Sequence, residues 1–595
     1  MSLTKVSFSM ITGALANVLD YGADITGTSD SSAAFTLAFA TGQMVYAPAG
    51  TYRLNNPSYT VQLNSGLIGD GSSTILKIYG ATTPDRATNG PFQSSLAGAL
   101  LTGAGGNLFR DFVIQAGDTF DYTKTYESWT NYNYTANNHI VGINVGSNSM
   151  VENVHCIQLY IPIGAIGQSN INIEKCSSDR SAFAAIWTAT CSKIAVNMGS
   201  WDRCGYFGGI VFSNATNISI SNNAWLFNPE STGVDIGGGV TTDSRVVITG
   251  NSIFAGDPIG IENGGRDIAI TGNQCCVAGG YVTFLDVTGI NTQLHAGAQN
   301  TLSSNVVISG NSVCWVDQNL AYVDFIGTGI DIGSIDGTQS AADITVSGNM
   351  IRGGESSIYV HGLSTISNSN IAITGNNCTH NSYGIKIENT NNGFVSSNAF
   401  ISGKTTTLAG TYGIYFPSGD IANIVFSSNM TMGYAVHIQQ DIPGAATNLN
   451  CGASVMQNHT FMPNPNDLAA YTAFTNSGTG TSLNIRPLGR IQTVSAITYS
   501  TNNITLGNSG SGFAATATTQ INLISNVNWQ DGNVVRILFE AGATTVKNAQ
   551  VSSGVYRPIL LATNTDYTSG AGGLGILSLM YDANANSWRE VCRVG

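Results

Sequence analysis

Carboxylates recur at one position of a short pattern in this 595-residue chain. The pattern is Gly-apolar-x-apolar, and in three copies x is Asp235, Glu262 and Asp331. Because successive side chains of a strand point to opposite faces, x points away from its apolar neighbours, and the three carboxylates would share one face. Since adjacent strands lie about 4.8 Å apart, we expect Asp235 and Glu262 to be neighbours, with Asp331 roughly 10 Å beyond Glu262.

Two carboxyl groups at such spacings are what the hydrolysis of a glycosidic bond requires. Retaining enzymes hold them about 5 Å apart, and inverting enzymes about 6.5–9.5 Å apart, which leaves room for a water molecule. Crowding of carboxylates on one face would raise the pKa of at least one of them, as a general acid needs. The three carboxylates are therefore predicted to be catalytic, although a charged face that only keeps the sheet solvated would have the same pattern.

Two long copies of the repeat carry insertions that would form a wall beside these carboxylates. The insertions contain GGYVTFLDVTG and VCWVDQNLAYVDFIGTG. Their acidic residues extend the acidic group, and Asp286 and Asp324 are further catalytic candidates beside Asp317. Their aromatic residues offer faces on which sugar rings stack, and these are Tyr281, Trp315 and Tyr322.

Other copies of the pattern place different residues at x, namely Asn144, Val211, Asn291, Tyr359, Lys386, Tyr415 and His437. Of these, we expect Asn291, Tyr359, Lys386 and Tyr415 to contact the substrate. Tyrosine, lysine and histidine are also the acids and bases of a polysaccharide lyase, which removes the proton alpha to a uronate carboxylate. A lyase needs cations for that carboxylate, and the chain offers few, Arg352, Lys386 and Lys404. A surface that binds glycan without cleaving it is a third interpretation.

The elements that position these residues repeat along the chain. An apolar-x-Gly/Ser-Asn corner, with Asn222 in place of Gly or Ser in the first copy, recurs with its asparagine at Asn223, Asn251, Asn273, Asn311, Asn349, Asn376, Asn398 and Asn429. The shortest interval is 22 residues, from Asn251 to Asn273 and again from Asn376 to Asn398, and the other intervals are longer by variable amounts. Each interval also holds short strands of alternating apolar and polar residues. Coils of a parallel β-helix with loops inserted at the corners explain this pattern, and the corner asparagines would then stack into ladders.

Composition narrows the class of ligand. Charged residues make up 10% of the chain, against roughly 25% in an average soluble protein. The net charge of −13, without a basic run, argues against nucleic acid. We find no apolar run of about 18 residues, so no membrane insertion is expected. The ten cysteines lack zinc-site spacing, so we expect buried thiols, no metal and no cofactor. A polar, uncharged surface suits carbohydrate.

The segment NVLDYGADITGTSDSSAAFTLAFATGQMVYAPAGTYRLN, residues 17–55, resembles the first segment of pectate-lyase-like right-handed β-helices. The matching positions are Asp20, Gly22, Asp30, Pro48, Gly50 and Tyr52, with the helical stretch SSAAFTLAF between them. The resemblance implies an all-β, right-handed parallel β-helix. The apolar face of the helix would cover its open end.

The preceding LTKVSFSMITGA resembles the connector of bacteriophage tailspikes and polysaccharide depolymerases, and ILSLMYDANANSWREVCRVG resembles the closing strands of their small terminal β-domains. The resemblance implies a homotrimer on a phage tail, held by the baseplate or an adaptor protein. Such a protein recognises, and usually cleaves, a bacterial surface polysaccharide (O-antigen or capsule). It is made in the host cytoplasm and acts outside the host cell as part of the virion.

We expect five segments. Residues 1–16 would be the connector for attachment to the virion, 17–60 the start and cap of the β-helix, and 61–460 the coils with a glycan-binding groove. Residues 461–484, which contain Pro463 and Pro465, would be a junction, and 485–595 a small antiparallel β-domain for trimerisation or glycan binding.

Overall fold

The computed structural model describes the chain from residue 15 to residue 594. The description leaves out residues 56, 80–95, 97, 118–139, 182, 205–207, 238–244, 262–265, 279–287, 295–303, 317–326, 335–340, 362–367, 404–409, 418–420, 441–454, 463–471, 477–483, 488–497, 501, 507–511, 516–519, 528, 530, 540–543 and 570–574. The chain divides into two units, Met1–Ala372 (unit 1) and Ile373–Gly595 (unit 2). Each unit is described by itself.

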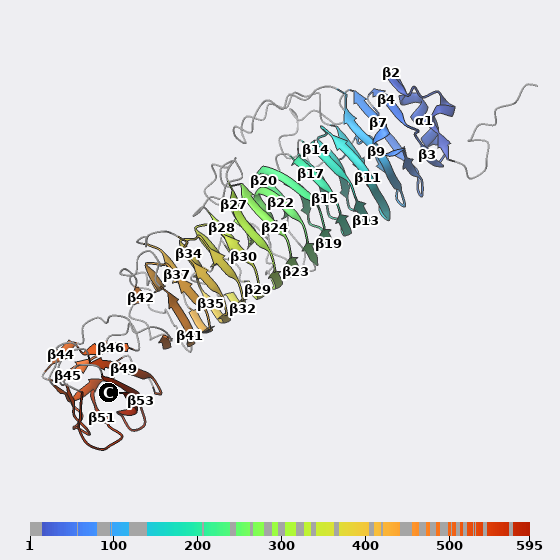
Figure 1. Cartoon of the computed structure of the whole chain (residues 1–595). Coiled ribbons are helices and arrows are strands. Elements are labelled where there is room, and N and C mark those ends of the chain that lie inside the picture. The colour runs from blue at the N-terminus through green and yellow to red at the C-terminus, as the bar shows by residue number, and fades with distance from the viewer. Residues whose placement is uncertain are drawn as a thin grey trace, which may run out of the picture. The chain divides into compact units, whose positions relative to one another are not determined.

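Unit 1 begins with short strands and one α-helix. The strands are β1 (Ala16–Asn17), β2 (Thr26–Asp30), β3 (Met44–Tyr46), β4 (Gly50–Asn55), β5 (Tyr59–Val61), β6 (Gly66–Ile68), β7 (Thr74–Tyr79) and β8 (Leu101–Gly103), with 3-10 turns at Val18–Tyr21 and Gly71–Ser73. Helix α1 (Ser32–Ala40) lies where the sequence predicts a helix. Its buried Phe35 meets the Tyr52 ring edge-on at 5.4 Å, and Phe39 lies 5.3 Å from the Tyr59 ring. The helix therefore packs on strands of the first coils (Figure 1).

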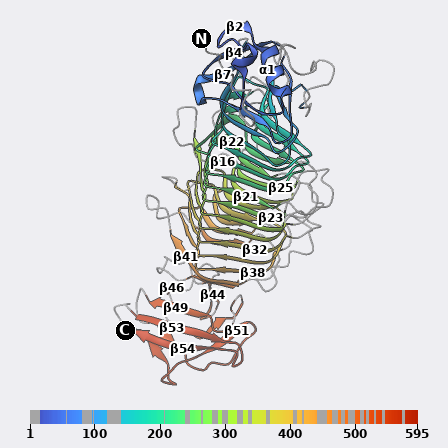
Figure 2. The same cartoon turned by 90° about the vertical axis from the view of Figure 1, so that its right-hand side faces the viewer.

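The rest of unit 1 is built from parallel strands, each paired with its equivalent one coil along. Sheet 1 contains β10 (Val141–Asn144), β12 (Ile161–Ile166), β15 (Ala184–Ala189), β18 (Gly208–Ser213), the second parts of β20 (Trp225–Gly237) and β22 (Ser252–Ile261), β25 (Thr288–Leu294), β28 (Thr328–Ser334) and β31 (Ser356–His361). Sheet 2 contains the first parts of β9 (Leu108–Ala116) and β11 (Ser149–Ile157), then β13 (Ser169–Glu174), β16 (Ser192–Asn197), β19 (Thr216–Ser221), β21 (Val246–Thr249), β23 (Arg266–Thr271), β26 (Ser304–Ser309) and β29 (Ala342–Ser347). Figure 2 shows strands of sheet 2, among them β16, β21 and β23, one above another.

Sheet 3 completes each coil of unit 1. It contains the second parts of β9 and β11, the first parts of β20 and β22, and β14 (Ser177–Ser181), β17 (Ser200–Cys204), β24 (Gln274–Ala278), β27 (Ser312–Val316) and β30 (Met350–Arg352). The register stacks apolar side chains inside the coils. One interior column of sheet 1 runs through Ile163, Ile186, Ile210, Val234 and Ile259, and beyond β25 it continues through Ile330 and Ile358. This all-β architecture is the one expected of a right-handed parallel β-helix.

The corner asparagines form the predicted ladder. In unit 1 each side-chain amide donates to the side-chain oxygen of the next corner asparagine, at 2.8–3.0 Å, through Asn223, Asn251, Asn273, Asn311 and Asn349. In unit 2 the same bond, at 2.9 Å, joins Asn376 to Asn398 and Asn398 to Asn429. All eight are buried. We call these two runs the asparagine ladder.

Strand β32 (Asn368–Thr374) spans the boundary between the units in the sequence, and unit 2 continues with parallel strands. They are β33 (Asn377–Thr379), β34 (Tyr383–Ile387), β35 (Thr390–Ser396), β36 (Ala399–Ile401), β37 (Tyr412–Phe416), β38 (Ile421–Ser427), β39 (Met430–Met432), β40 (Val436–Gln440), β41 (Val455–Met462), β42 (Thr472–Asn476) and β43 (Asn484–Pro487). Parallel pairing of β40 with β42 and of β41 with β43 continues through the segment expected to be a junction.

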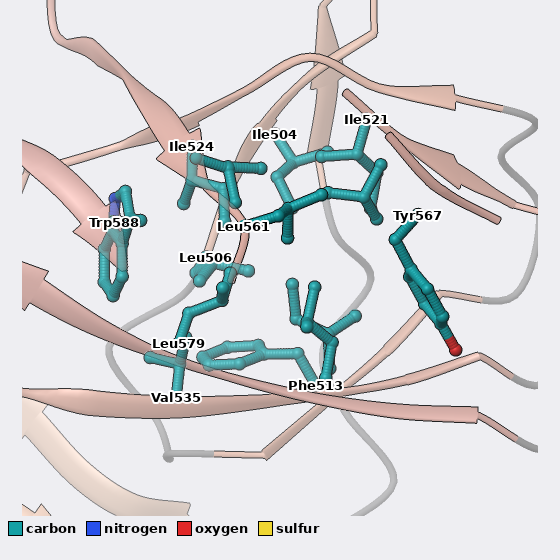
Figure 3. Close-up of a cluster of buried hydrophobic side chains, with 14 of the residues drawn as sticks. Ile504, Leu506, Phe513, Ile521, Ile524, Val535, Leu561, Tyr567, Leu579 and Trp588 are labelled. Carbon is teal, nitrogen blue, oxygen red and sulfur yellow. The ribbon is translucent and has the colours of Figure 1, made fainter. Parts of the chain in front are cut away.

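Unit 2 then holds an eight-stranded sheet in the order β44-β45-β48-β51-β54-β53-β49-β46 and a three-stranded sheet β47-β50-β52. Their bounds are β44 (Thr498–Ser500), β45 (Asn503–Thr505), β46 (Gly512–Ala515), β47 (Gln520–Ile521), β48 (Leu523–Ser525), β49 (Val534–Phe539), β50 (Thr545–Val546), β51 (Tyr556–Leu560), β52 (Tyr567–Thr568), β53 (Gly575–Asp582) and β54 (Ser587–Val594). The expected antiparallel pairing holds only for some of these strands, such as β49 with β53 and β53 with β54, because β46 pairs with β49, and β51 with β54, in parallel. Apolar side chains, Phe513 and Trp588 among them, fill the space that these strands enclose (Figure 3).

No helix in the described part of the chain is long and apolar enough to cross a membrane.

Candidate active site

The outward column of sheet 1 carries the carboxylates that the sequence analysis selected. In successive coils its members are Asn144, Gly164, Trp187, Val211, Asp235, Gly260, Asn291, Asp331 and Tyr359. Each pairs with the next through the parallel register. The prediction that Asp235, Asn291, Asp331 and Tyr359 occupy one column is therefore confirmed.

The predicted place of Glu262 in this column is wrong. The residue beside Asp235 is Gly260, because Val234 pairs with Ile259 and Ile236 with Ile261. Both isoleucines are buried, so they take the interior positions. The sequence pattern aligned the glycines of two coils, whereas the apolar side chains set the register. Glu262 itself directly follows the end of β22 and lies outside the described residues.

In unit 2 the same error affects His437. Its neighbour Ile438 pairs with Ile414, so Gln439, not His437, lies beside Tyr415. His437 is completely buried, and its Nδ1 lies 2.8 Å from the hydroxyl of Thr431. His437 therefore belongs to the interior and not to the outward face.

Asp235 and Asp331 are too far apart to act as a carboxylate pair. Three coil steps separate them, through Gly260 and Asn291. At about 4.8 Å a step their backbones lie roughly 14 Å apart. An inverting glycosidase needs at most about 9.5 Å between its carboxyls. The strand register therefore contradicts the prediction that Asp235 and Asp331 act together in one site.

Both aspartates are nonetheless shielded from solvent, with exposed fractions of 6% for Asp235 and 3% for Asp331. In the two coils before Asp235, the column residues Trp187 and Val211 are buried too, in a cluster that includes Leu96. The outward face of sheet 1 is therefore shielded from solvent at these four positions.

Asp331 makes the most specific contact on this face. Its Oδ2 lies 3.1 Å from Nε2 of His361, whose side chain is 22% exposed. The rings of His361 and Tyr359 lie 3.5 Å apart between centroids. His361 pairs with Gly333, which has no side chain to separate the imidazole from Asp331. We call these three residues the Asp331 cluster.

The Asp331 cluster brings together a carboxylate, an imidazole and a phenol. With its proton on Nε2, His361 donates a hydrogen bond to Asp331 and fixes the direction of the carboxylate. All three groups can accept or donate protons in catalysis. The sequence analysis missed His361, although a signal existed, since His361 follows Tyr359 by two residues and so shares its face.

Trp315 does not offer a surface for sugar stacking, which corrects the prediction. It is completely buried, pairs with Val277 and shares the interior face of β27 with Val313, two residues before it. A side chain at Gly354 would come within 3.0 Å of its indole ring. Strand β27 runs to Val316, so Trp315 belongs to the coil and not to the insertion that follows.

Lys386 and Tyr415, predicted to bind substrate, pair with one another in unit 2 and are partly exposed. Asn291 lies in β25, in the column described above. Glu262, Asp286, Asp324, Tyr281 and Tyr322 lie outside the described residues. Their predicted roles remain predictions.

Cysteines follow the expectation of free thiols. Cys156, Cys176, Cys191 and Cys275 are free and buried, and Cys378 is buried too. Burial raises the pKa of the Cys176 thiol to about 12, so it stays protonated near neutrality. Sγ of Cys276 lies 3.1 Å from Sγ of Cys314 on the next coil. Among the described residues, no group of three or more His, Cys, Asp or Glu could hold a metal ion.

The fold is that of a parallel β-helix, and the first part of the chain also matches a known family by sequence. Residues 15–94 match the family described as rhamnogalacturonase A/epimerase, pectate lyase-like. This match supports the resemblance seen in the sequence, and it covers the segment with α1 and the first coils.

Solved structures provide further comparisons. A tailspike protein mutant of E. coli bacteriophage HK620 in complex with a pentasaccharide is 13% identical, with a TM-score of 0.46 over 95% of this chain and 90% of that one. A family 28 exopolygalacturonase of Yersinia enterocolitica is 11% identical, with a TM-score of 0.42 over 69% and 78%. A GH87 alpha-1,3-glucanase of Streptomyces thermodiastaticus is 16% identical, with a TM-score of 0.34 over 80% and 68%. No curated protein matches the sequence.

Proposed function

We propose that this protein degrades polysaccharide, and more specifically that it is a phage tailspike that binds and cleaves a bacterial surface polysaccharide as an endo-glycosidase. The observation that carries the proposal is the Asp331 cluster, a shielded carboxylate 3.1 Å from an imidazole on the outward face of a β-helix coil. The low charge of the chain, 10% of residues, supports a glycan as the ligand.

In the proposed reaction Asp331 is the general base. It takes a proton from a water molecule that attacks the anomeric carbon, and His361 holds the carboxylate toward that water. A second carboxyl group protonates the glycosidic oxygen as the bond breaks. Glu262 is our candidate for this acid, because the end of β22 lies two coil steps, roughly 10 Å, from β28. That spacing favours inversion at the anomeric carbon.

The remaining parts take supporting roles in this proposal. Helix α1 caps the open end of the coils, because its buried face lies on the first strands. Residues 485–595 hold three chains together as a homotrimer, and the N-terminal residues 1–16 attach the trimer to a tail or adaptor protein. The protein would then act in the virion at the host surface. A monomeric mass in light scattering would contradict the trimer.

The test uses surface polysaccharides from candidate hosts and measures new reducing ends. We expect Asp331→Asn and Glu262→Gln to abolish turnover while glycan binding and oligomeric mass stay unchanged. Asp267→Asn is the matched control, because Asp267 is an exposed carboxylate at a corner of sheet 2. Full turnover by Asp331→Asn would remove Asp331 from the site.

One observation favours a second candidate, a lyase. Tyr359 and His361 lie in ring contact beside Asp331 and so supply a base and an acid for β-elimination. A lyase would produce unsaturated uronate, detected by its ultraviolet absorbance, with no net addition of water. Binding of a polysaccharide that stays intact would instead identify a non-catalytic adhesin.

A further inference from the structure

Three tyrosines gather on the strands β34 and β37 of unit 2. Tyr383 and Tyr412 begin these strands and pair with one another, and Tyr415 follows three residues after Tyr412. Ring centroids are 5.7 Å apart for Tyr383 and Tyr412, 5.4 Å for Tyr383 and Tyr415, and 4.8 Å for Tyr412 and Tyr415. The rings depart from parallel by only 19–32°, so their outer faces point in similar directions.

The interior of these coils does not account for the tyrosines. Ile385 and Ile414 pair with one another inside and are completely buried. The three tyrosines remain partly exposed instead. A gathering of large aromatic rings at the surface of a protein marks a binding site more often than a packing need.

Lys386 adds a cation to the aromatic rings. It pairs with Tyr415, and its Nζ lies 5.2 Å from the centroid of the Tyr383 ring. This is the distance of a cation–π contact, which holds the ammonium group close to the ring face. The ammonium carries three hydrogen-bond donors and a full positive charge in a chain of net charge −13. A ligand at this place would meet apolar faces and one positive charge together.

These two features define the ligand. The carbon-bound hydrogens of a sugar ring stack on aromatic faces, while the hydroxyl groups stay hydrated. One ammonium group complements one carboxylate, the single negative charge of a uronic acid. We infer that Tyr383, Tyr412, Tyr415 and Lys386 form a binding site for an acidic sugar residue of a polysaccharide. The inference rests on the proposed function for its choice of glycan, and it adds that the glycan is acidic.

Isothermal titration calorimetry on the full-length protein tests this site. The probes are an oligogalacturonate and a neutral malto-oligosaccharide of equal length, both with Asp331→Asn present so that no cleavage interferes. We expect the oligogalacturonate to bind and the neutral chain to bind weakly or not at all. Binding should weaken as salt is added, because the charge pair is partly exposed.

Variants then separate the two features of the site. Lys386→Met should lower the affinity for the oligogalacturonate about fivefold, the size expected for a partly exposed charge pair, and remove its salt dependence. Lys193→Met, at an exposed lysine of unit 1, is the matched control. Changing all three tyrosines to alanine should abolish binding, whereas changing them to phenylalanine should preserve it, since stacking needs only the ring.

Several outcomes would overturn the inference. These are equal binding of the neutral and the acidic chain, equal effects of Lys386→Met and Lys193→Met, and absence of oligogalacturonate binding by the parent protein. If Lys386→Met fails to fold, Lys386→Arg, which keeps the charge, must retain binding. If the protein cleaves a neutral polysaccharide but does not bind the oligogalacturonate, only the acidic-sugar site is contradicted. If it binds the oligogalacturonate but cleaves no glycan, the proposed hydrolysis is contradicted and the acidic-sugar site stands.

Discussion

Asn273 donates its side-chain amide to the side-chain oxygen of Asn311 at 3.0 Å, although 38 residues separate them in the sequence. The backbone N–H of Asn273 donates to the same oxygen at 2.9 Å. One buried amide therefore satisfies donors on the neighbouring coil at a corner where regular strand pairing is interrupted. Groups left unsatisfied there would have no access to water.

Replacing Asn311 by leucine should destabilise unit 1. The variant removes the acceptor for Asn273 and the donor to the carbonyl oxygen of Ile270, 2.9 Å away. Each buried group left without a partner costs about 1–3 kcal/mol. We expect the free energy of unfolding to fall by at least about 2 kcal/mol in urea titrations. Asn172→Ala, on the outward face of sheet 2, is the control, and equal losses for both variants would contradict the role of the ladder.

Trp315→Ala should destabilise the protein by about 3–5 kcal/mol, the usual cost of removing a buried aromatic side chain. Because the indole is completely buried, the folded fraction should bind glycan with unchanged affinity. Denaturant titration and calorimetry on the same preparations measure the two effects. If the free energy of unfolding stayed unchanged and glycan binding were lost, Trp315 would stack on a sugar ring, as the sequence analysis predicted.

His361→Gln should lower kcat about 100-fold and leave KM nearly unchanged. Glutamine can still donate to Asp331, but it cannot hold the carboxylate at the same distance, and a displacement of about 1 Å can cost that much. Glycan binding and the urea midpoint separate positioning from loss of structure, because both should stay unchanged in the variant while kcat falls. A variant with an unaltered kcat would show that the contact with Asp331 is incidental to catalysis.

The eight-stranded sheet should lose stability in acid through Glu590. The Arg593 guanidinium, with its Nε 2.5 Å from Oε1, lowers the pKa of Glu590, as does the backbone N–H of Ala562. Since the folded pKa lies below the unfolded one, the stabilisation is present above the unfolded value and is lost as pH falls through the folded value. Urea titrations of Arg593→Met should show a smaller loss in acid than the parent protein. Equal losses would exclude this pair as a cause.

Much of the fold could be predicted from the sequence because the fold repeats. The asparagine of each corner and the alternating apolar residues recur, and both are needed in every coil. The helix at 32–40 was predicted from the resemblance of residues 17–55 to the first segment of pectate-lyase-like β-helices. The mixed pairing of the last sheets could not be predicted, since strand direction there depends on connections between distant segments and no repeat reveals it.

The site was predicted less well for a physical reason. Asp331 and Tyr359 were placed in one column correctly, because the apolar pair around each is unambiguous. Glu262 was misplaced because Gly260 precedes one isoleucine and follows another, so two registers fit the pattern of small and apolar residues. Only the burial of both isoleucines decides between them. His361 was missed because its importance arises from a contact across strands.

The direction of the asparagine ladder has a consequence for how the coils depend on one another. Between Asn223 and Asn311 each side-chain amide donates to the corner asparagine of the following coil, as Asn251 does to Asn273 and Asn273 to Asn311. Each of these corners is therefore completed by an oxygen from the coil that follows it, so loss of one coil would leave donors of the coil before it without their acceptor.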